Sequence, residues 1–339
     1  MQAICDANGV RLRPHAKSHK SSRIAREQMK AGAVGVCCAT INEAETMTAA
    51  GLAGLLITAP LVTDVKIARL RDLCETAPDT MAVIDNAENA RALSAAFENR
   101  AALNALVDLD VGHHHTGAVD PDVAFELARL IAKTPNLRLR GVQGYGGHFQ
   151  HIADAAQRGA AAAEGRAQIG RLVALMREAG LGVGVVTGAG TGTHGLDASS
   201  GVFTEIQAGS YIFMDAEYAA INYEGGAWPF GFSLFVQTSV LSANLPTQVT
   251  TDAGTKAFAL NGPPPRILCG PLRGAVYGFS GDEHGRILLA PGTAPPLIGE
   301  RIECLVPHCD PTVCLYDAYV CVRGDQVVDV WPIDARGRA

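Results

Sequence analysis

The sequence predicts a (β/α)8 TIM-type barrel followed by a β-rich C-terminal domain, and three observations lead to this fold class. Short β-branched or apolar runs alternate with alanine-rich helical stretches from residue 10 to residue 211. Eight such βα units within about 210 residues match the usual size of a closed parallel barrel. After Tyr218 the helical periodicity stops, and short apolar runs separated by Gly and Pro turns replace it. A doubly wound open sheet is the main alternative for the first part.

The elements of the first part follow from this alternation. Polar residues at Asn42, Asp64 and Asp120 are expected to cap three of the helices. The expected strands span 10–17, 34–39, 54–58, 81–85, 105–110, 137–145, 183–187 and 204–211. The expected helices span 22–32, 42–50, 64–75, 87–98, 122–133 and 160–179. Residues 1–8 resemble the end of a helix that leads into the first strand.

The second part begins near residues 222–227, where Glu224-Gly225-Gly226 indicates a loop. We therefore expect a barrel domain at 1–222 and a β-rich domain at 223–339. The strands expected in the second domain span 231–240, 248–251, 286–289, 303–306 and 319–322.

Composition excludes several classes of protein. Of the 339 residues, 48% are hydrophobic and 18% are charged, which is typical of a compact globular protein and not of a disordered one. A formal net charge of -6 gives no basic footprint for nucleic acid. No apolar run approaches the roughly 20 residues that span a bilayer, and no signal-peptide pattern opens the chain. Nine irregularly spaced cysteines do not form a disulfide framework. We expect a cytoplasmic protein with reduced thiols.

A basic stretch, residues 13–20 (RPHAKSHK), follows the first expected strand. A lysine at the carboxyl end of a strand suits a Schiff base, and neighbouring cations or burial would lower the pKa of Lys17 and free its amine. Taken alone, the stretch is explained more simply as a solvated basic turn before a helix.

Polar residues follow several other strands, at the end of a barrel where active sites form. The loop 188–193 (GAGTGT) offers unobstructed backbone N–H groups and two hydroxyls, which suits a phosphate held together with 209–211 on the next strand. A turn that needs glycine only for its backbone conformation remains the alternative. Of the adjacent His113, His114 and His115, we expect one to face the site, since consecutive side chains diverge.

In the second domain, His308 and Asp310 are two residues apart. If this segment is extended, both side chains point the same way and one divalent cation can bind both. Open coordination positions would then remain for water or substrate. A polar turn before Pro311 is the simpler explanation of the spacing alone.

Together these motifs resemble the fold-type III pyridoxal-phosphate enzymes of the D-threonine aldolase, D-3-hydroxyaspartate aldolase and D-serine dehydratase group. The residues that carry the resemblance are 13–20 (RPHAKSHK), 108–112 (DLDVG), 141–145 (GVQGY), 205–211 (EIQAGSY) and 308–312 (HCDPT). The resemblance extends over nearly the whole chain. It implies an alanine racemase-like barrel and β-domain, in a homodimer whose active sites form at the subunit boundary. The family's opening strand and most of its first helix are missing, so we expect a truncated start or an upstream segment.

The resemblance also implies roles for single residues. Lys17 would carry pyridoxal 5'-phosphate as a Schiff base, with Tyr145 and Gln207 near the ring. The phosphate would be held by Thr191, Gly192, Thr193, Gly209, Ser210 and Tyr211. His115 stands where the family has an arginine near the phenolic oxygen, which is a departure from the pattern.

The same resemblance makes His308 and Asp310 ligands of a divalent metal, Mn²⁺ first and Mg²⁺ or Zn²⁺ as alternatives. His151 would help with the proton of a β-hydroxyl group. Members of the dehydratase branch tend to have cysteine at the position of Asp310, so aspartate favours an aldolase.

The expected function is cleavage of a small D-3-hydroxy amino acid, of the D-threonine or D-3-hydroxyaspartate type, to glycine and an aldehyde. One alternative is elimination of water from D-serine or D-3-hydroxyaspartate, which gives a keto acid and ammonia. A non-catalytic pyridoxal-phosphate-binding protein is a further alternative. Proteins of that kind usually consist of the barrel alone, so the β-rich domain argues against it.

Overall fold

A computed structural model describes residues 1–223 and 226–337, and its first part is a closed parallel barrel. Hydrogen-bonded neighbours follow the order β1-β8-β7-β6-β5-β4-β3-β2. A parallel bridge between His15 and Cys37 joins β1 to β2 and closes the ring. The predicted barrel is confirmed, and the open sheet is wrong. The strands are β1 Arg11–Leu12, β2 Val36–Cys38, β3 Leu55–Ile57, β4 Met81–Ile84, β5 Leu103–Asp108, β6 Leu137–Gly144, β7 Val185–Gly188 and β8 Glu205–Ile206.

Helices surround the barrel. Their starts follow from side-chain caps: the Thr40 and Thr63 hydroxyls and the Asp120 carboxylate accept hydrogen bonds from the first backbone N–H groups. Asp120 was predicted, but the caps expected at Asn42 and Asp64 are wrong, because threonines just before them take that role. The α-helices are α1 Gln2–Ala7, α2 Ser22–Lys30, α3 Ile41–Ala49, α4 Asp64–Thr76, α5 Ala87–Ala96, α6 Pro121–Lys133, α7 Ala155–Glu178, α8 His194–Ala198 and α9 Ala216–Ala219.

The strands β1 and β8 end earlier than expected, and short 3-10 turns replace their last residues. β1 stops at Leu12 and is followed by η1 Ala16–Ser18, so Lys17 lies in a turn and not at the end of a strand. Pro14 lacks the N–H that would continue the ladder. The other turns are η2 Gly147–Phe149, η3 Thr191–Thr193 and η4 Ser210–Ile212.

The second part is built on an antiparallel six-stranded sheet in the order β11-β14-β9-β10-β13-β12. Its strands are β9 Phe235–Leu245, β10 Gln248–Thr251, β11 Arg266–Ile267, β12 Tyr277–Phe279, β13 Gly285–Leu288 and β14 Arg301–Leu305. The helix α10 Cys309–Val313 and the hairpin of β15 Ala318–Arg323 and β16 Gln326–Pro332 complete it. The sequence missed β11, β12 and β16, because very short strands and a polar start leave little period-2 signal.

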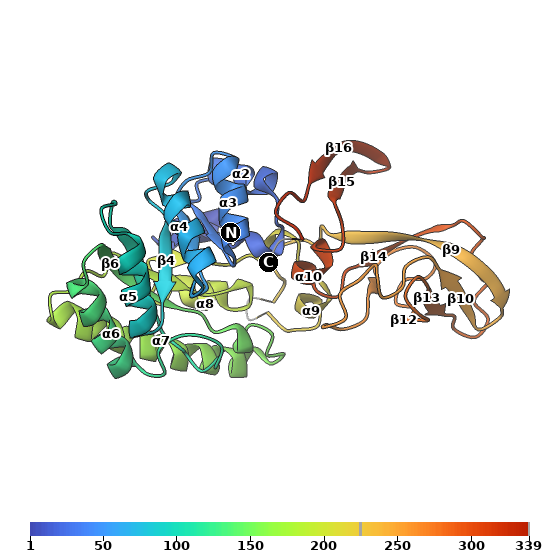
Figure 1. Cartoon of the computed structure of the whole chain (residues 1–339). Coiled ribbons are helices and arrows are strands. Elements are labelled where there is room, and N and C mark those ends of the chain that lie inside the picture. Colours follow the sequence, from blue (N-terminus) through green and yellow to red (C-terminus); the bar gives the residue numbers. More distant parts are fainter. Residues whose placement is uncertain (224–225, 338–339) are drawn as a thin grey trace.

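Figure 1 shows the barrel and the six-stranded sheet side by side, with α9 and α10 between them and the β15–β16 hairpin projecting from the same region. Each part has its own buried core, but Ile24 of the barrel helix α2 and Phe213 belong to the core of the second part. Apolar packing therefore joins the two parts at the place where α10 lies.

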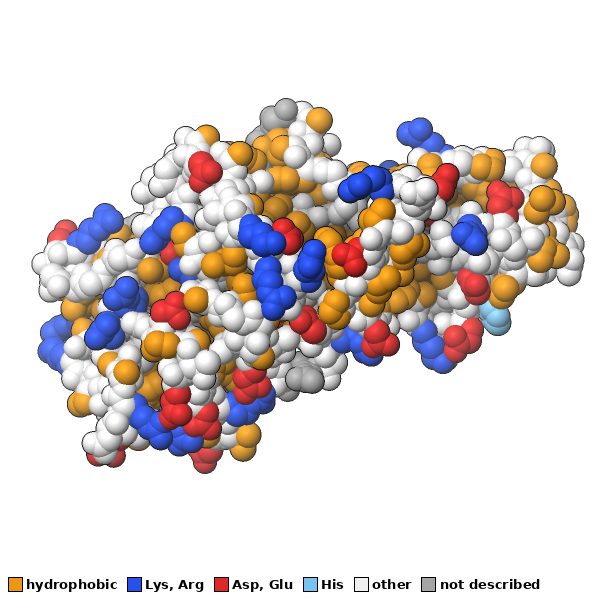
Figure 2. Space-filling model, turned by 90° about the horizontal axis from the view of Figure 1, so that it is seen from above, with side chains coloured by type: hydrophobic (Ala, Val, Ile, Leu, Met, Phe, Trp, Pro, Cys, Tyr) orange, Lys and Arg blue, Asp and Glu red, His pale blue; other side chains and the backbone are white. Residues whose placement is uncertain are grey.

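The predicted boundary falls between β8 and β9, and Glu224 and Gly225 of its expected loop lie outside the described residues. Figure 2 shows Lys and Arg interspersed with Asp and Glu on the face that it presents. In the part of the chain that the structure describes, no helix is both long and apolar enough to cross a bilayer.

Candidate active site

Lys17 lies in the η1 turn at the carboxyl end of the barrel. The turn is held by local bonds: the Lys17 N–H donates to His15 Nδ1 at 3.3 Å, and the Ser18 hydroxyl donates to the His15 carbonyl at 3.1 Å. The Lys17 amine lies 5.6 Å from the centre of the Tyr145 ring and 3.8 Å from Asp310 Oδ2. Its side chain is 38% exposed, so the amine is accessible.

The other cations of the basic stretch are each paired with an acid. Arg13 inside the barrel makes a bidentate pair with Glu205, with nitrogen–oxygen distances of 2.8 and 2.9 Å. Lys20 pairs with Glu43, whose carboxylate also accepts from the Ala39 N–H at 2.7 Å. These acids are buried, so the two cations add little positive field at Lys17.

The two histidines of the stretch are buried and uncharged at neutral pH. Burial lowers the pKa of His15 well below its ordinary value and lowers the pKa of His19 to about 4. The His15 ring lies 3.0 Å from the Thr58 hydroxyl, which itself donates to the Cys38 carbonyl. A neutral His15 that donates from Nε2 and accepts at Nδ1 satisfies both of its contacts.

The expected lowering of the Lys17 pKa is therefore wrong. The pKa of Lys17 is raised, first by the Tyr145 phenolic oxygen and further by the Asp310 and Glu43 carboxylates, although burial opposes the rise. The physical reason is that the neighbouring cations are neutral or paired, while the groups that face the amine are anionic or can become so.

A second polar cluster lies where the barrel meets α10. Ligand atoms of Asp215, Glu217 and His308 lie within 4.8 Å of one another. The Glu217 Oε2 atom is 3.5 Å from His151 Nε2 and 3.6 Å from His308 Nδ1, yet it is buried and has no hydrogen-bond partner among the described residues. Burial raises the pKa of both carboxyl groups. An orphaned carboxylate beside imidazoles fits a hard divalent cation.

The geometry expected for His308 and Asp310 is wrong, because the segment is not extended. His308 is the N-cap of α10, and Asp310 lies in the first helical turn. The Asp310 carboxylate faces Lys17 and accepts from the Ser210 hydroxyl at 3.4 Å, while His308 contacts Asn261 and Glu217. The helix therefore places these two side chains at neighbouring positions on the border of the two halves.

His151 lies on the same border. Its ring is 4.7 Å from the Tyr218 ring and 6.3 Å from the His308 ring, measured between centroids. Burial, and then the charge of His308, lower the pKa of His151 to about 4. His151 is consequently neutral and able to accept a proton at pH 7.

The loops after β7 and β8 are joined to each other. The Tyr211 N–H donates to the Thr191 hydroxyl at 3.0 Å, and a Cβ on Gly209 would lie 2.9 Å from the His15 carbonyl. A Cβ on Gly192 would lie 2.0 Å from the Gln150 carbonyl. The glycines are thus needed for close packing, and they bring the two loops next to the turn that carries Lys17.

The side chains of these loops differ in availability. The buried Thr193 hydroxyl is already bonded to Gln150 and Asp197. The Tyr211 hydroxyl accepts from Gln28 at 3.0 Å, and burial raises its pKa to about 12. Thr193 can therefore offer a ligand its backbone N–H rather than its hydroxyl, whereas both the hydroxyl and the backbone N–H of Tyr211 are already engaged.

The three adjacent histidines diverge as expected. His114 pairs with Asp110 at 2.9 Å, and His115 is exposed with its ring against the edge of His113. His113 stacks on His148, and a Cβ on Gly147 would meet both His113 and Tyr145. His113 therefore lies on the Tyr145 side, and the described contacts do not bring His115 there.

The sequence missed Asp215 and Glu217 as functional residues. The available signal was an acid pair two residues apart, shortly after the eighth strand. Asp108 entered the sequence analysis only as part of the motif 108–112. In the structure, Asp108 is buried and accepts from Gln143 and Thr116, and burial raises its pKa to about 6.

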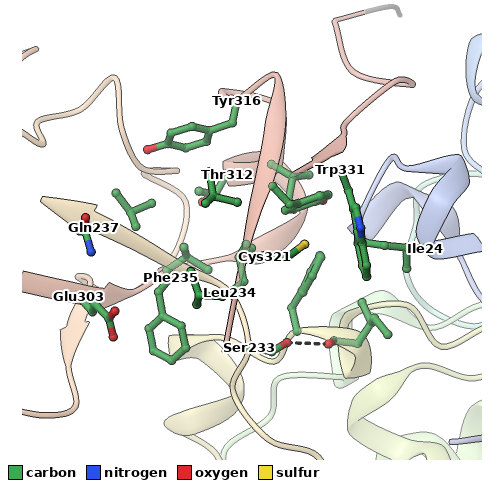
Figure 3. Close-up of a pocket in the computed structure, with 18 of the residues that line it drawn as sticks. Ile24, Ser233, Leu234, Phe235, Gln237, Glu303, Thr312, Tyr316, Cys321 and Trp331 are labelled. Carbon is green, nitrogen blue, oxygen red and sulfur yellow. Dashed lines mark hydrogen bonds between the residues drawn. The ribbon is translucent and has the colours of Figure 1, made fainter. Parts of the chain in front are cut away.

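A separate groove of about 1530 Å³ lies between α2, the six-stranded sheet and the β15–β16 hairpin. Lys17, His151 and His308 do not line it. Figure 3 shows its apolar and aromatic walls, with the Ser233 hydroxyl donating to the Ile212 carbonyl at 2.9 Å. The labelled lining residues include Ile24, Leu234, Phe235, Tyr316, Cys321 and Trp331. Gln237 and Glu303 also line the groove, and it is separate from the Lys17 site.

Comparisons with known proteins agree with this arrangement. Residues 1–217 match the family model "Alanine racemase, N-terminal domain", and residues 233–322 match "Putative serine dehydratase domain". The chain is 39% identical to a D-threonine aldolase of Arthrobacter sp. (99% of this chain, 88% of that protein) and 33% identical to a 3-hydroxy-D-aspartate aldolase of Paracoccus denitrificans (98% and 86%). A D-threo-3-hydroxyaspartate dehydratase of Delftia sp. is more distant at 28% (98% and 92%).

Among solved structures, D-threonine aldolase from Filomicrobium marinum superposes with a TM-score of 0.95 at 38% identity, over 99% of this chain and 91% of that one. The barrel, the antiparallel second part and the lysine turn define the class of fold-type III pyridoxal-phosphate enzymes. Within that class, the chain belongs to the alanine racemase-like family that includes D-threonine aldolase and 3-hydroxy-D-aspartate aldolase.

Proposed function

We propose that the protein is a lyase that cleaves D-3-hydroxy amino acids, of the D-threonine or D-3-hydroxyaspartate type, to glycine and an aldehyde. The observation that carries this proposal is the position of Lys17, whose accessible amine lies beside Tyr145 and 3.8 Å from Asp310. The Lys17 amine and the Glu217 carboxylate, whose Oε2 atom has no hydrogen-bond partner among the described residues, both lie on the border where the barrel meets α10, and a small polar substrate can contact them there.

Pyridoxal 5'-phosphate fits the barrel half of this border. Lys17 supplies the amine that would hold its aldehyde carbon, and Tyr145 and Gln207 lie beside the expected ring position. His115 is a further proposed contact of the ring, although its exposed side chain would have to turn inward. The phosphate would bind the loops after β7 and β8 through Thr191, Gly192, Thr193, Gly209, Ser210 and Tyr211. When bound, the cofactor accepts the electrons of the breaking Cα–Cβ bond.

A divalent metal fits the other half, where carboxylate and imidazole groups converge. His308, a member of this cluster, and the neighbouring Asp310 are the proposed ligands. Mn²⁺ is proposed ahead of Zn²⁺ because carboxylate oxygens prefer a harder ion, and ahead of Mg²⁺ because an imidazole nitrogen prefers a softer one. Such a metal would orient and polarise the β-hydroxyl of the substrate. The proposed domains divide the work: residues 1–222 bind the cofactor, and residues 223–339 supply the metal ligands.

The chain's own residues then handle the protons. His151 is neutral at pH 7 and accepts the β-hydroxyl proton, since its pKa is about 4. Glu217, 3.5 Å from His151 Nε2, holds the imidazole in place and stabilises its charged form. Loss of the hydroxyl proton forms the aldehyde as the Cα–Cβ bond breaks, and a proton added at Cα gives glycine.

The first test is Lys17→Ala. We expect the variant to lose the visible absorbance of the bound cofactor. Lyase activity should fall by at least about 10³-fold, since removal of the group that bonds to the cofactor disables the whole site. Lys30→Ala is the matched control, because Lys30 lies on the exposed face of α2 and pairs only with Glu27. A Lys17→Ala protein with both cofactor absorbance and activity would refute the proposal.

A dehydratase is the second candidate, since residues 233–322 match a serine dehydratase domain. The same groups would then help the β-hydroxyl to leave as water, which gives a keto acid and ammonia. A panel of D-threonine, D-3-hydroxyaspartate, D-phenylserine and D-serine, with and without chelator, separates the two functions. Glycine with an aldehyde supports the lyase, and ammonia with a keto acid supports the dehydratase.

We also propose a cytoplasmic homodimer. The β15–β16 hairpin supports the dimer, because it exposes more than half of the surface of Val320, Val322, Val327 and Val330. Exposed apolar surface of this kind is typical of protein interfaces. Light scattering of the purified protein tests this, and a monomer at micromolar concentration would contradict it.

A further inference from the structure

The amide of Gln143 has only one orientation that satisfies its neighbours. Its Nε2 atom donates to the Thr58 carbonyl at 3.0 Å and to Asp108 Oδ1 at 2.9 Å. A peptide carbonyl can only accept hydrogen bonds, and an ionised carboxylate also only accepts. The Gln143 NH2 group must therefore point toward Thr58 and Asp108, and its Oε1 atom must point away from them.

The orientation of the Gln143 amide in turn fixes the orientation of the Gln207 amide. The Gln207 Nε2 atom donates to Gln143 Oε1 at 3.1 Å, so the NH2 group of Gln207 is also committed. Its Oε1 atom is the polar atom that remains, and it has no hydrogen-bond partner in residues 1–223 and 226–337. Gln207 is 3% exposed, so its amide cannot turn freely in water.

The far end of this chain of hydrogen bonds is fixed as well. The second carboxylate oxygen of Asp108 accepts from the Thr116 hydroxyl at 2.8 Å. All the hydrogen bonds of this chain therefore have the same direction: Gln207 donates to Gln143, and Gln143 donates to Thr58 and Asp108.

Gln207 lies next to the turn that carries Lys17. The residue after it, Ala208, accepts a hydrogen bond from the His15 N–H at 3.3 Å. Glu205 points into the barrel, where it pairs with Arg13. Backbone pairing continues one residue past β8, where the Gln207 N–H donates to the Gly188 carbonyl at 2.8 Å. Extended residues two apart share one face, so Gln207 points to the barrel axis like Glu205, nearer to the site.

Pyridoxal phosphate has few hydrogen-bond donors that could pair with the Gln207 Oε1 acceptor. Its phosphate and phenolic oxygens accept hydrogen bonds, whereas its ring nitrogen donates one when it is protonated. We propose that Gln143, held by Asp108 and the Thr58 carbonyl, orients Gln207 so that Gln207 Oε1 accepts a hydrogen bond from the protonated ring nitrogen of bound pyridoxal phosphate. This inference rests on the proposed function. A protonated ring withdraws electrons more strongly, so Gln143 is a positioning residue for that chemistry.

The test uses the holoenzyme loaded with pyridoxal phosphate that carries ¹⁵N at the ring nitrogen. In the wild-type protein we expect the nitrogen resonance of a protonated ring. Gln207→Leu removes the acceptor, and Gln143→Leu leaves Gln207 free to turn, so both should move the resonance toward the unprotonated position. In the Gln143→Leu/Gln207→Leu protein, the first change should have no further effect, because it acts through Gln207.

Thr187→Val is the matched control. Thr187 is paired with Gln143 in the sheet, and its buried hydroxyl has no hydrogen-bond partner among the described residues. We expect the ring-nitrogen resonance in the Thr187→Val protein to equal that in the wild type. A shift in Thr187→Val would show that any change near Gln143 disturbs the ring, and it would overturn the inference.

Three other results would also overturn it: an unprotonated ring in the wild type, a wild-type resonance in folded Gln207→Leu, or an added shift from Gln143→Leu in the double variant. If Gln143→Leu fails to fold, the wild-type and Gln207→Leu resonances still decide. A wild-type chain that takes up no cofactor would instead reject the proposed function itself. The two failures are therefore distinguishable.

Discussion

The two halves of the site differ in how far their polar groups are satisfied within the chain. In the barrel half, Arg13 pairs with Glu205, and Gln207 is held through Gln143 by Asp108. In the half at α10, the Glu217 Oε2 atom is buried without a hydrogen-bond partner among the described residues. Folding alone pairs the Arg13 and Glu205 charges of the barrel half, whereas the Glu217 carboxylate gains a favourable interaction when a cation or substrate arrives.

This difference affects two properties of the site: the rigidity of the barrel half and the metal affinity of the half at α10. Groups that are already hydrogen-bonded keep their positions before the ligand binds, so little ordering is needed during binding. Buried carboxylates without a counter-charge destabilise the folded chain, and burial raises the pKa of both Asp215 and Glu217. A bound cation relieves that destabilisation. The free energy regained when the carboxylates are neutralised therefore adds to the affinity for the metal.

The strongest test of the barrel half is Glu205→Ala. It leaves the Arg13 guanidinium buried without its bidentate partner, and breaking a buried pair in this way costs about 3–5 kcal/mol. The free energy of unfolding in urea measures this loss. Glu126→Ala is the matched control, because its pair with Arg129 is exposed and should contribute less than about 1 kcal/mol. Equal losses in the two variants would contradict a barrel half held together by its own ion pair.

The sequence was sufficient to predict the barrel because each βα unit carries its own local signal. Alternation, cap residues such as Asp120, and glycine-rich loops are local features, and the structure contains them near the expected places. The ends of strands were less predictable. The residues after β1 and β8 form 3-10 turns, which period-2 alternation in the sequence does not reveal.

The electrostatics of the site were not predictable from sequence. Lys17 lies among basic residues in the chain, but Glu205, which neutralises Arg13, is 192 positions away from it. Likewise, Glu217 meets His308 only because α9 and α10 pack together where the two parts join. Local sequence shows which charges are present, whereas tertiary packing decides which of them cancel.

Metal addition tests the α10 half. With Mn²⁺ at about 100 times its dissociation constant, the free energy of unfolding should rise by about 2.7 kcal/mol, since the ion binds only the folded chain. Thermal unfolding with Mn²⁺ and after chelation measures the effect. His308→Ala should abolish it, and Glu217→Gln should reduce it by removing a negative charge from the cluster.

Glu283→Gln is the matched control for Glu217→Gln, because Glu283 forms an exposed pair with Lys256 in the same part of the molecule. It should keep the full Mn²⁺ effect. Stabilisation by Mn²⁺ that is unchanged in both His308→Ala and Glu217→Gln would place the ion elsewhere and remove the contrast between the two halves.

The smallest expected effect concerns Asp108, a buried carboxylate of the barrel half. Its pKa of about 6 lies above the ordinary 3.8, because burial outweighs the hydrogen bonds from Gln143 and Thr116. Between these two pH values the folded chain holds a proton that the unfolded chain has released. Stability contributed by this proton is therefore present below about pH 4 and is lost as the pH rises through 6.

Asp108→Asn removes this titration while it keeps an acceptor for Gln143 and offers an N–H to Thr116. The full pKa difference corresponds to roughly 3 kcal/mol, and we expect a gain of about 1–2 kcal/mol at pH 8, since the neutral hydrogen bonds are weaker. No gain is expected at pH 4, where Asp108 is already protonated. Urea unfolding at both pH values measures the difference. A variant that is less stable than the wild type at pH 8 would mean that the Asp108 charge itself stabilises the barrel, and that the two halves of the site follow one electrostatic rule.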